Sequence, residues 1–276
     1  MGFFGLFNYE KEGPGIAKDA PKKKTFFVFF ETFFRNFWKF IPINLVYSLL
    51  SIPVITIGLS NAGLTNVARN TARDKHSFGL SDFWDTIKAN WRQALPVGII
   101  NTIIYILLIF DIYFFYVSSY GILSPIGMGI SIALLVVFYI MNFYIWTMMI
   151  TFDFTIKQIF SNSFRFVFLN MKNNLICVVC MALSTAFFVG VFAALSYFKD
   201  IIFGAIITVM LSSVLLPLFK FLIIQYCVFP SIKKYVIDPY YEEHPDEDIE
   251  KRRNLGIEIK SEEDEESDGE ELLFND

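Results

Sequence analysis

Residues Pro125 to Ile150 read PIGMGISIALLVVFYIMNFYIWTMMI, a run of 26 positions without a charged side chain. A helix of about 20 residues crosses the roughly 30 Å of hydrocarbon in a bilayer. Such a helix also pairs its backbone N–H and C=O groups internally, as a segment without access to water must. This stretch therefore predicts a helix that spans a membrane.

The same apolar character recurs along the chain, which is 55% hydrophobic with a mean hydropathy of +0.50. One weaker segment, Ile41 to Leu59, is interrupted by Pro42 and Pro53. We therefore predict an all-α polytopic membrane helical bundle of about five transmembrane helices, surrounded by the lipid bilayer. The other three strong segments are Leu95 to Val117, Leu175 to Phe198 and Ile201 to Phe229.

An amphipathic pattern precedes the first apolar segment, between Lys22 and Phe40. Polar residues such as Glu31 and Arg35 recur there at helical spacing, and phenylalanines fill many positions between them. The pattern predicts a helix at the membrane surface, with aromatic rings in the acyl boundary and cations in water. The alternative is an N-terminal extension of the first spanning helix. We expect amphipathic helices in the cytoplasmic loops as well.

Three parts of the chain differ in composition: an N-terminal segment (1–40), a transmembrane helical domain (41–237) and an acidic tail (238–276). The tail has 17 acidic and 4 basic residues, whereas the body before it has 19 basic and 10 acidic ones, so their formal charges are −13 and +9. Such a tail buries too little apolar surface to fold alone, and we predict that it is disordered. No cleavage-site pattern follows the N-terminus, which is expected to be retained.

Basic residues are concentrated in two loops, 61–93 and 151–174, and again shortly before the tail. The positive-inside rule places these loops and the tail in the cytoplasm and makes the chain a multi-pass protein of the cell membrane. Five spans would put the N-terminus outside, although Arg35 and Lys39 favour the inside. A re-entrant segment at 41–59 is the alternative, and its broken backbone would need protein cover at membrane depth.

The most distinctive stretch is SIPVITIG, from Ser51 to Gly58. Pro53 removes one helical hydrogen bond, Gly58 frees the backbone, and small residues let helices approach closely. A helix should bend or end here, with Thr56 inside the bend. The bend is either a packing kink or the broken helix of a solute-binding site.

Three motifs carry a resemblance to a known family. They read GLTNVAR, FWDTIKANWRQA and FDFTIKQ, at residues 63–69, 83–94 and 152–158. They resemble the motifs of the YesL-like family of bacterial integral membrane proteins. The positions within them that we single out as candidate structural or interaction sites are Arg69, Lys88, Asn90, Asp153 and Lys157.

The YesL-like family has no defined activity, but its genes commonly lie beside sugar-uptake transporters in Gram-positive bacteria. The resemblance covers most of residues 8–234 and implies a non-catalytic partner or regulator of a carbohydrate (oligosaccharide) uptake system. Its partners would be subunits of an ABC-type sugar transporter. The alternative is a small-solute or sugar transporter in its own right. The oligomeric state is left open.

Two ionisable residues, Asp111 and Lys220, fall inside predicted spans, where charge is costly and often functional. Their expected depths differ by roughly 10 Å, on a rise of about 1.5 Å per residue, so a direct ion pair is not expected. Each of these two residues either anchors its helix at the membrane interface or takes part in ion coupling. Asn101, Asn142 and Gln225 either bond helices to one another or line a solute pathway.

No group of residues suggests catalysis. The chain has no Walker A loop, no HExxH motif and no acidic pair in a plausible cleft, so we expect no enzyme, cofactor or metal centre. Cys177 and Cys180 form a CxxC inside a span, which predicts buried small residues rather than a redox pair. The basic residues flank spans, where topology accounts for them, so nucleic-acid binding is not expected.

Overall fold

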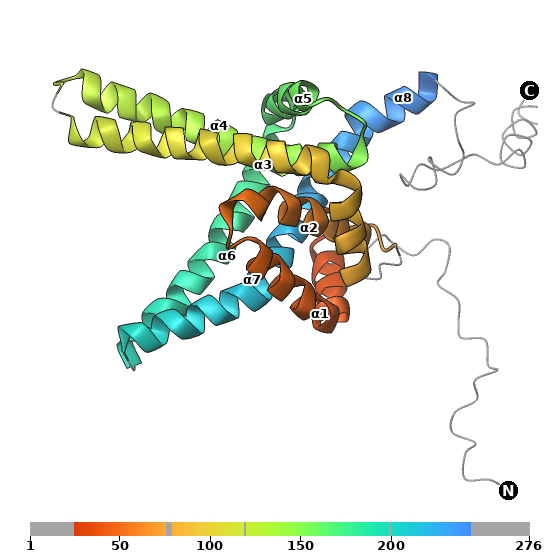
Figure 1. Ribbon diagram of the computed structural model, residues 1–276, viewed down its shortest axis with the longest axis horizontal. Helices are drawn as coiled ribbons and strands as arrows, with labels where there is room; N and C mark the ends of the chain where they lie inside the picture. The colour runs from red at the N-terminus through yellow and green to blue at the C-terminus, as the bar shows by residue number, and fades with distance from the viewer. Residues whose placement is uncertain (1–24, 76–78, 119, 199, 244–276) are drawn as a thin grey trace, which may run out of the picture.

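The computed structural model describes residues 25–75, 79–118, 120–198 and 200–243 (Figure 1). Of these residues 92% are helical and none forms a strand, which confirms the all-α prediction. The helices are α1 (Thr25–Leu50), η1 (Val54–Thr56), α2 (Ile57–Ala72), α3 (Leu80–Val117), α4 (Leu123–Thr151), α5 (Ile156–Leu169), α6 (Met171–Phe198), α7 (Ile201–Ile232), η2 (Lys233–Ile237) and α8 (Asp238–Glu243).

Among the described residues, four helices are long and apolar enough to cross a membrane: α3, α4, α6 and α7. The predicted number of five is not confirmed, because residues 41–59 do not form one continuous helix. They comprise the end of α1, a break, the 3₁₀ turn η1 and the start of α2. The fold is therefore a membrane helical bundle of four candidate spans plus a broken helical pair.

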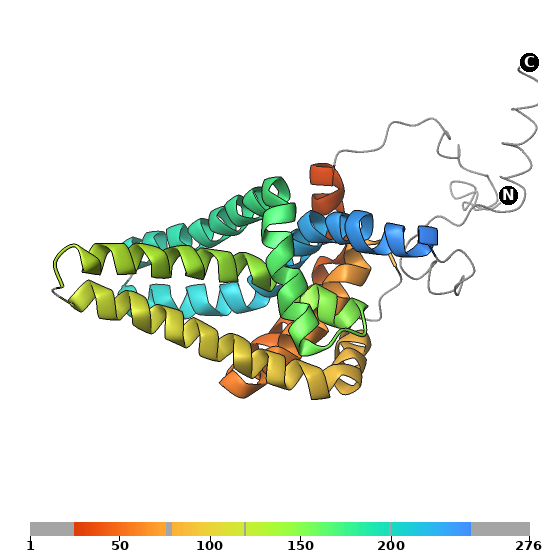
Figure 2. The ribbon, with the colours of Figure 1, turned by 90° about the horizontal axis from the view of Figure 1, so that it is seen from above.

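The helices pair into three antiparallel hairpins that turn toward the same end of the molecule (Figures 1 and 2). We call α3–α4 and α6–α7 the long hairpins, and α1–α2 the short hairpin. The end at which the long hairpins turn is the turn end, and the opposite end, where α5 and α8 lie, is the junction end. The long hairpins splay apart toward the turn end, and the short hairpin reaches less far.

Large apolar side chains cover the outside of the long hairpins. Ile106, Leu107 and Phe110 on α3 are exposed, as are Val209 and Met210 on α7. In water such a surface would be unfavourable, but in a bilayer the acyl chains solvate it as well as a protein interior would. The exposure pattern fits a lipid environment for the four spans.

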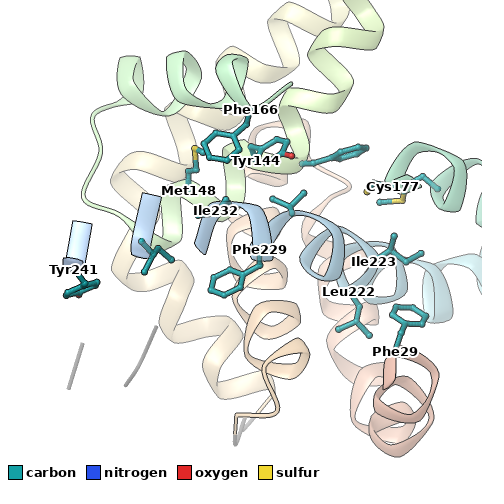
Figure 3. Close-up of a cluster of buried hydrophobic side chains, with 14 residues drawn as sticks. Phe29, Tyr144, Met148, Phe166, Cys177, Leu222, Ile223, Phe229, Ile232 and Tyr241 are labelled. Atoms are coloured by element: carbon teal, nitrogen blue, oxygen red, sulfur yellow. The ribbon is translucent and has the colours of Figure 1, made fainter. Parts of the chain in front are cut away.

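The hydrophobic core lies at the junction end. Side chains from α1, α4, α5, α6, α7 and α8 meet in one cluster (Figure 3), which includes Phe29, Tyr144, Phe166 and Phe229. Cys177 is buried in this cluster, and all three cysteines are free. The CxxC therefore packs inside the bundle and forms no disulfide in this structure.

The connection between α4 and α6 is the amphipathic helix α5. Thr155 and Gln158 form a capping box at its start, in which each side chain bonds the other residue's backbone N–H. Ile159, Ser163 and Phe166 face inward at helical spacing. This agrees with the amphipathic loop helices expected from the sequence.

The N-terminal amphipathic helix and the start of the first apolar segment form one helix, α1, which passes through Pro42 without ending. Residues 1–24 of the predicted N-terminal segment lie outside the described residues. The same holds for residues 244–276 of the predicted acidic tail. The first residues of that tail still pack on the bundle, because Tyr241 of α8 is buried in the core cluster.

Candidate functional site

The helix α2 lies at the centre of the molecule, in contact with α1, α3, α4 and α7. Ten of its 16 residues are buried, although most of them are small or polar. A helix with small side chains lets neighbouring backbones approach closely, which favours association in lipid through packing and hydrogen bonds. This central helix carries most of the features that follow.

The closest approach of α2 to a neighbour is at Gly58, where its backbone touches α3. A Cβ atom added at Gly58 would lie 2.2 Å from the carbonyl oxygen of Ala94 and 2.8 Å from the Cα atom of Gly98. A Cβ atom added at Gly98 would lie 2.6 Å from the Cα atom of Gly58. Only glycine fits at either position. Gly58, singled out from the sequence for a bend, thus also forms a helix contact.

A polar cluster joins α2 to α3 and α4 near the junction end. The Arg69 guanidinium donates to Thr151 Oγ1 over 2.7 Å, to the carbonyl oxygen of Ile150 over 3.3 Å and to Asn66 Oδ1 over 2.9 Å. Asn66 Nδ2 in turn donates to Thr86 Oγ1 over 2.7 Å. We call Asn66, Arg69, Thr86, Asn90 and Thr151 the Arg69 cluster.

The charge of Arg69 is held by neutral oxygens. Among the described residues no carboxylate pairs with it, and its Nε atom is buried without a hydrogen-bond partner. Burial and, to a smaller extent, the nearby charge of Arg73 lower the pKa of Arg69 to about 10. At neutral pH the side chain therefore remains a cation, at a desolvation cost that its hydrogen bonds must offset.

A shallow polar pocket opens beside the Arg69 cluster. Asn90 contributes to both, because its Nδ2 donates to the carbonyl oxygen of Thr86 over 3.0 Å and its side chain also lines the pocket. The pocket has a volume of about 330 Å³. Its walls offer amide donors and carboxylate acceptors for a polar ligand or for a partner's backbone. It is lined by Asn66, Asn70, Asp82, Asp85, Thr86, Ala89, Asn90 and Ile150.

A second set of polar contacts fastens α1 to α7 within the spans. Pro217 of α7 has no N–H group, so the carbonyl oxygen of Ser213 loses its helical partner. Ser48 of α1 donates to that oxygen over 3.2 Å. Asn44 bridges the next position, since its Nδ2 donates to the Val214 carbonyl over 2.7 Å and its Oδ1 accepts from the Leu218 N–H over 2.9 Å.

The turn of the short hairpin satisfies its polar groups locally. Thr56 Oγ1 donates to the carbonyl oxygen of Leu50, and it lies 2.8 Å from that of Pro53. Ser51 Oγ donates to the Tyr47 carbonyl over 2.7 Å and lies 3.0 Å from Ser60 Oγ. These groups bond one another rather than aim into a cavity. The chain breaks where the proline predicted a bend, in the form of a packed turn.

The remaining candidate residues lie apart from the Arg69 cluster. Lys88 is exposed and forms an ion pair with Asp85 over 3.8 Å. Asp153 and Lys157 are exposed at the start of α5, Asp111 is exposed on α3, and Lys220 is half-buried on α7. No ion pair joins Asp111 to Lys220 among the described residues. Apart from Pro53 and Thr56, which share the turn of the short hairpin, only Arg69 and Asn90 among the candidate residues lie in one cluster.

The polar residues inside the spans form separate helix contacts. Asn101 of α3 donates to Asn142 of α4 over 2.7 Å. Gln225 of α7 donates to Thr147 of α4 over 2.8 Å. Each pair joins two helices, which is the helix-bonding alternative raised from the sequence.

Sequence reasoning missed Asn66, Thr86 and Thr151, which complete the Arg69 cluster. One signal was present, since Asn66 precedes Arg69 by three residues and therefore lies on the same helix face. The positions of Thr86 and Thr151 depend on how α3 and α4 pack on α2. That packing is not encoded in any local pattern.

Comparison with known proteins adds one match. A family model described as a protein of unknown function, DUF624, matches residues 40–112. These residues comprise the end of α1, all of α2 and most of α3, including the Gly58 contact and most of the Arg69 cluster. No curated protein and no solved structure matches the chain.

Proposed function

We propose that this chain is a non-catalytic membrane partner or regulator of a carbohydrate uptake system. One observation carries the proposal: polar groups in the spans are used in helix contacts, whereas polar groups at the junction end line an open pocket. Asn101 and Gln225 each bond a neighbouring helix, but Asn70 and Asp85 face the pocket. This distribution favours a surface that binds something over a pathway that conducts something.

The carbohydrate link is supported by resemblance. The matched DUF624 family is the one associated with YesL, and the motifs at 63–69, 83–94 and 152–158 resemble the YesL-like family. Genes of that family lie beside sugar-uptake transporters in Gram-positive bacteria. The proposed partners are therefore the membrane subunits of an ABC-type sugar transporter.

The proposed setting is the cell membrane, with the junction end in the cytoplasm. Basic residues of α1, α3 and α5 gather at that end, among them Arg35, Lys88 and Lys157, and the positive-inside rule assigns it to the cytoplasmic side. Such an orientation would place the polar pocket where cytoplasmic and membrane partners are accessible. Labelling of a single cysteine introduced at Gly121, in a chain without its own three cysteines, should succeed from outside the cell.

The alternative of a small-solute transporter has less support. Its motivation was the broken first segment and the polar residues inside the spans. In the structure the turn at Pro53 satisfies its own polar groups, and Asn101, Asn142 and Gln225 point to separate helix contacts. A transport pathway would need these groups to converge on one water-accessible cavity.

A membrane pull-down tests the proposal. Tagged full-length protein should enrich subunits of a sugar importer from detergent-solubilised membranes, compared with an unrelated tagged membrane protein. Asn70→Ala combined with Asp85→Ala should reduce that enrichment about tenfold, equivalent to roughly 1.4 kcal/mol. The matched control, Tyr120→Ser at the turn end, should not. If no importer subunit is enriched above the unrelated control, the proposed function is wrong.

A further inference from the structure

The side of α5 that faces away from the bundle is not the polar side expected of a loop helix. Its inner side packs on the bundle through Ile159 and Phe166, which are buried. On the opposite side Phe164 is 48% exposed and Phe168 is 57% exposed. A surface helix usually presents charged and polar residues there. We call the exposed residues Lys157, Ser161, Phe164, Arg165 and Phe168 the outer face of α5.

The outer face forms one continuous strip. Its members recur every three or four residues, which is the spacing of neighbours on one side of a helix. The rings of Phe164 and Phe168 pack edge to face, with their centroids 5.3 Å apart. Scattered single apolar residues are common on protein surfaces, but a packed aromatic pair is a patch that needs an apolar environment.

The connections of α5 fix its level in the membrane. It follows the candidate span α4, which ends at Thr151, and it precedes the candidate span α6, which begins at Met171. Because both of these span ends lie at the junction end, the two ends of α5 lie at the same membrane boundary. The helix axis runs across the direction of the long hairpins (Figures 1 and 2). The helix therefore runs along the level at which the spans leave the hydrocarbon.

The charge on this side of α5 is entirely positive. Lys157 and Arg165 belong to the outer face, and Lys172 is exposed at the second position of α6. No acidic residue occurs between Asp153 and Asp200. Among the described residues none of these three cations has an ion pair. A layer of anionic headgroups would supply the missing negative charge along the length of the helix.

We propose that the outer face of α5 binds an anionic lipid surface, with the Phe164 and Phe168 rings inserted at the boundary of the acyl chains. Lys157, Arg165 and Lys172 contact the lipid phosphates, with their apolar stems beside the rings and their charged ends in the headgroup layer. This boundary offers an apolar solvent for the rings and anions for the cations at the same place. The contact fixes the level of the junction between α4 and α6. This inference is independent of the proposed function.

Photocrosslinking from the lipid tests insertion of the rings. Full-length protein is placed in nanodiscs of phosphatidylglycerol and phosphatidylcholine, one of which carries a diazirine in its acyl chain near the headgroup, and the labelled peptides are identified by mass spectrometry. We expect adducts on the outer face of α5 from both lipids. Phe164→Ser combined with Phe168→Ser should remove most of them. Leucine at both positions keeps the apolar contact and should preserve them, which separates insertion from any change in folding.

The same measurement tests the preference for anionic lipid. Phosphatidylglycerol should give about fivefold more adducts on α5 than phosphatidylcholine, because the cations attract the anionic headgroup. Arg165→Gln combined with Lys172→Gln should abolish this preference, whereas Arg165→Lys combined with Lys172→Arg keeps both charges and should retain it. The matched control is Lys88→Gln, which removes an exposed cation of α3 outside the outer face and should leave the adducts on α5 unchanged.

Three results would overturn the proposal. Adducts around Val209, which is 63% exposed on α7, without adducts on α5 would show that lipid does not reach the outer face. A preference for phosphatidylglycerol that survives Arg165→Gln with Lys172→Gln would show that these cations do not select the lipid. Zero-length crosslinks from Lys157 to carboxylates of the acidic tail or of a second copy, in place of lipid adducts, would identify a protein occupant instead.

Discussion

The short hairpin α1–α2 and the long hairpin α3–α4 have the same design but are held together differently. Both are antiparallel helix pairs that turn toward the same end of the molecule (Figure 2). In the short hairpin the contacts with the rest of the bundle include the polar and close backbone contacts of Gly58, Asn44 and Arg69, beside buried apolar side chains such as Leu64 and Val67. In the long hairpin most of the surface is apolar and faces lipid, and only 7 of the 38 residues of α3 are buried.

The difference shows which forces fold each part. The long hairpins are stable in lipid because their helices are long enough to cross the hydrocarbon and mostly apolar. Their backbone groups pair within each helix, so their transfer into hydrocarbon leaves no backbone hydrogen bond unmade. The short hairpin is not apolar enough to be a candidate span, and its break exposes backbone groups that need partners. It therefore depends on specific polar and close backbone contacts in addition to its apolar packing. Substitutions in the short hairpin should be much more harmful than comparable ones in the long hairpins.

The largest effect is expected for Gly58→Ala. The added methyl group would collide with the backbone at Ala94 and Gly98, which cannot move as a side chain can. We expect a loss of roughly 3 kcal/mol in the free energy of unfolding, at the upper end of ordinary point mutations. The midpoint of unfolding in an SDS titration measures it. The matched control is Gly129→Ala in α4, where nothing lies within 4 Å of the new Cβ atom; equal losses at both positions would remove the comparison.

The second-largest loss in the free energy of unfolding is expected for Asn44→Leu. It leaves the Val214 carbonyl and the Leu218 N–H without the bridging amide, in surroundings that hold little water. Leaving a buried polar group unpaired costs about 1–3 kcal/mol. Pro217→Ala supplies the missing N–H and lets α7 straighten, so it should partly rescue Asn44→Leu. Simple additivity of the two changes in an unfolding titration would argue against the bridge.

A moderate effect is expected for Arg69→Gln. The variant loses the hydrogen bonds to Thr151 and Ile150 that join α2 to α4, but it also removes a buried charge, which is costly in itself. We expect a net loss of about 1–2 kcal/mol at neutral pH. Arg92→Gln is the control, because Arg92 is exposed on α3. A gain in stability for Arg69→Gln would show that desolvation outweighs the hydrogen bonds.

The pH dependence of the stability difference between the wild type and Arg69→Gln provides a sharper check. Because burial lowers the pKa of Arg69 to about 10 in the folded protein, the unfolded chain binds more protons above that pH. Stability contributed by this residue should therefore rise as the pH increases beyond 10. The difference in unfolding midpoint between wild type and Arg69→Gln, followed from pH 8 to 11, should change in favour of the wild type.

The smallest effect is expected for Asp111→Asn. Asp111 is exposed on the long hairpin and has no ion pair among the described residues. Substitutions away from buried features usually change stability by less than about 0.5 kcal/mol. The same SDS titration should therefore barely distinguish it from the wild type. A large loss would mean that ion coupling, the alternative raised from the sequence, has to be reconsidered.

The sequence predicted the long hairpins well because hydropathy is a local property. The run from Pro125 to Ile150 falls within α4, and its identity needs no knowledge of its neighbours. The short hairpin was harder. Pro53 correctly indicated a break, but whether Ile41 to Leu59 is a fifth span or a re-entrant segment was left open, because hydropathy alone cannot show that Asn44 would find partners on α7. Arg69 and Asn90 were singled out, but the threonines that complete their cluster come from distant helices.

The bridge between Asn44 and α7 has a consequence for biogenesis. Asn44 is separated by 170 and 174 residues from the two positions it bonds. At about 5–20 residues per second, the ribosome finishes α7 roughly 9–36 s after α1. During this time the short hairpin lacks its bridge to α7, and the amphipathic α1 can lie at the membrane surface. The first hairpin to be synthesised is therefore the last to gain all its contacts. A nascent chain that stalls before α7 should expose a short hairpin without its contacts to α7, which membrane quality control could recognise.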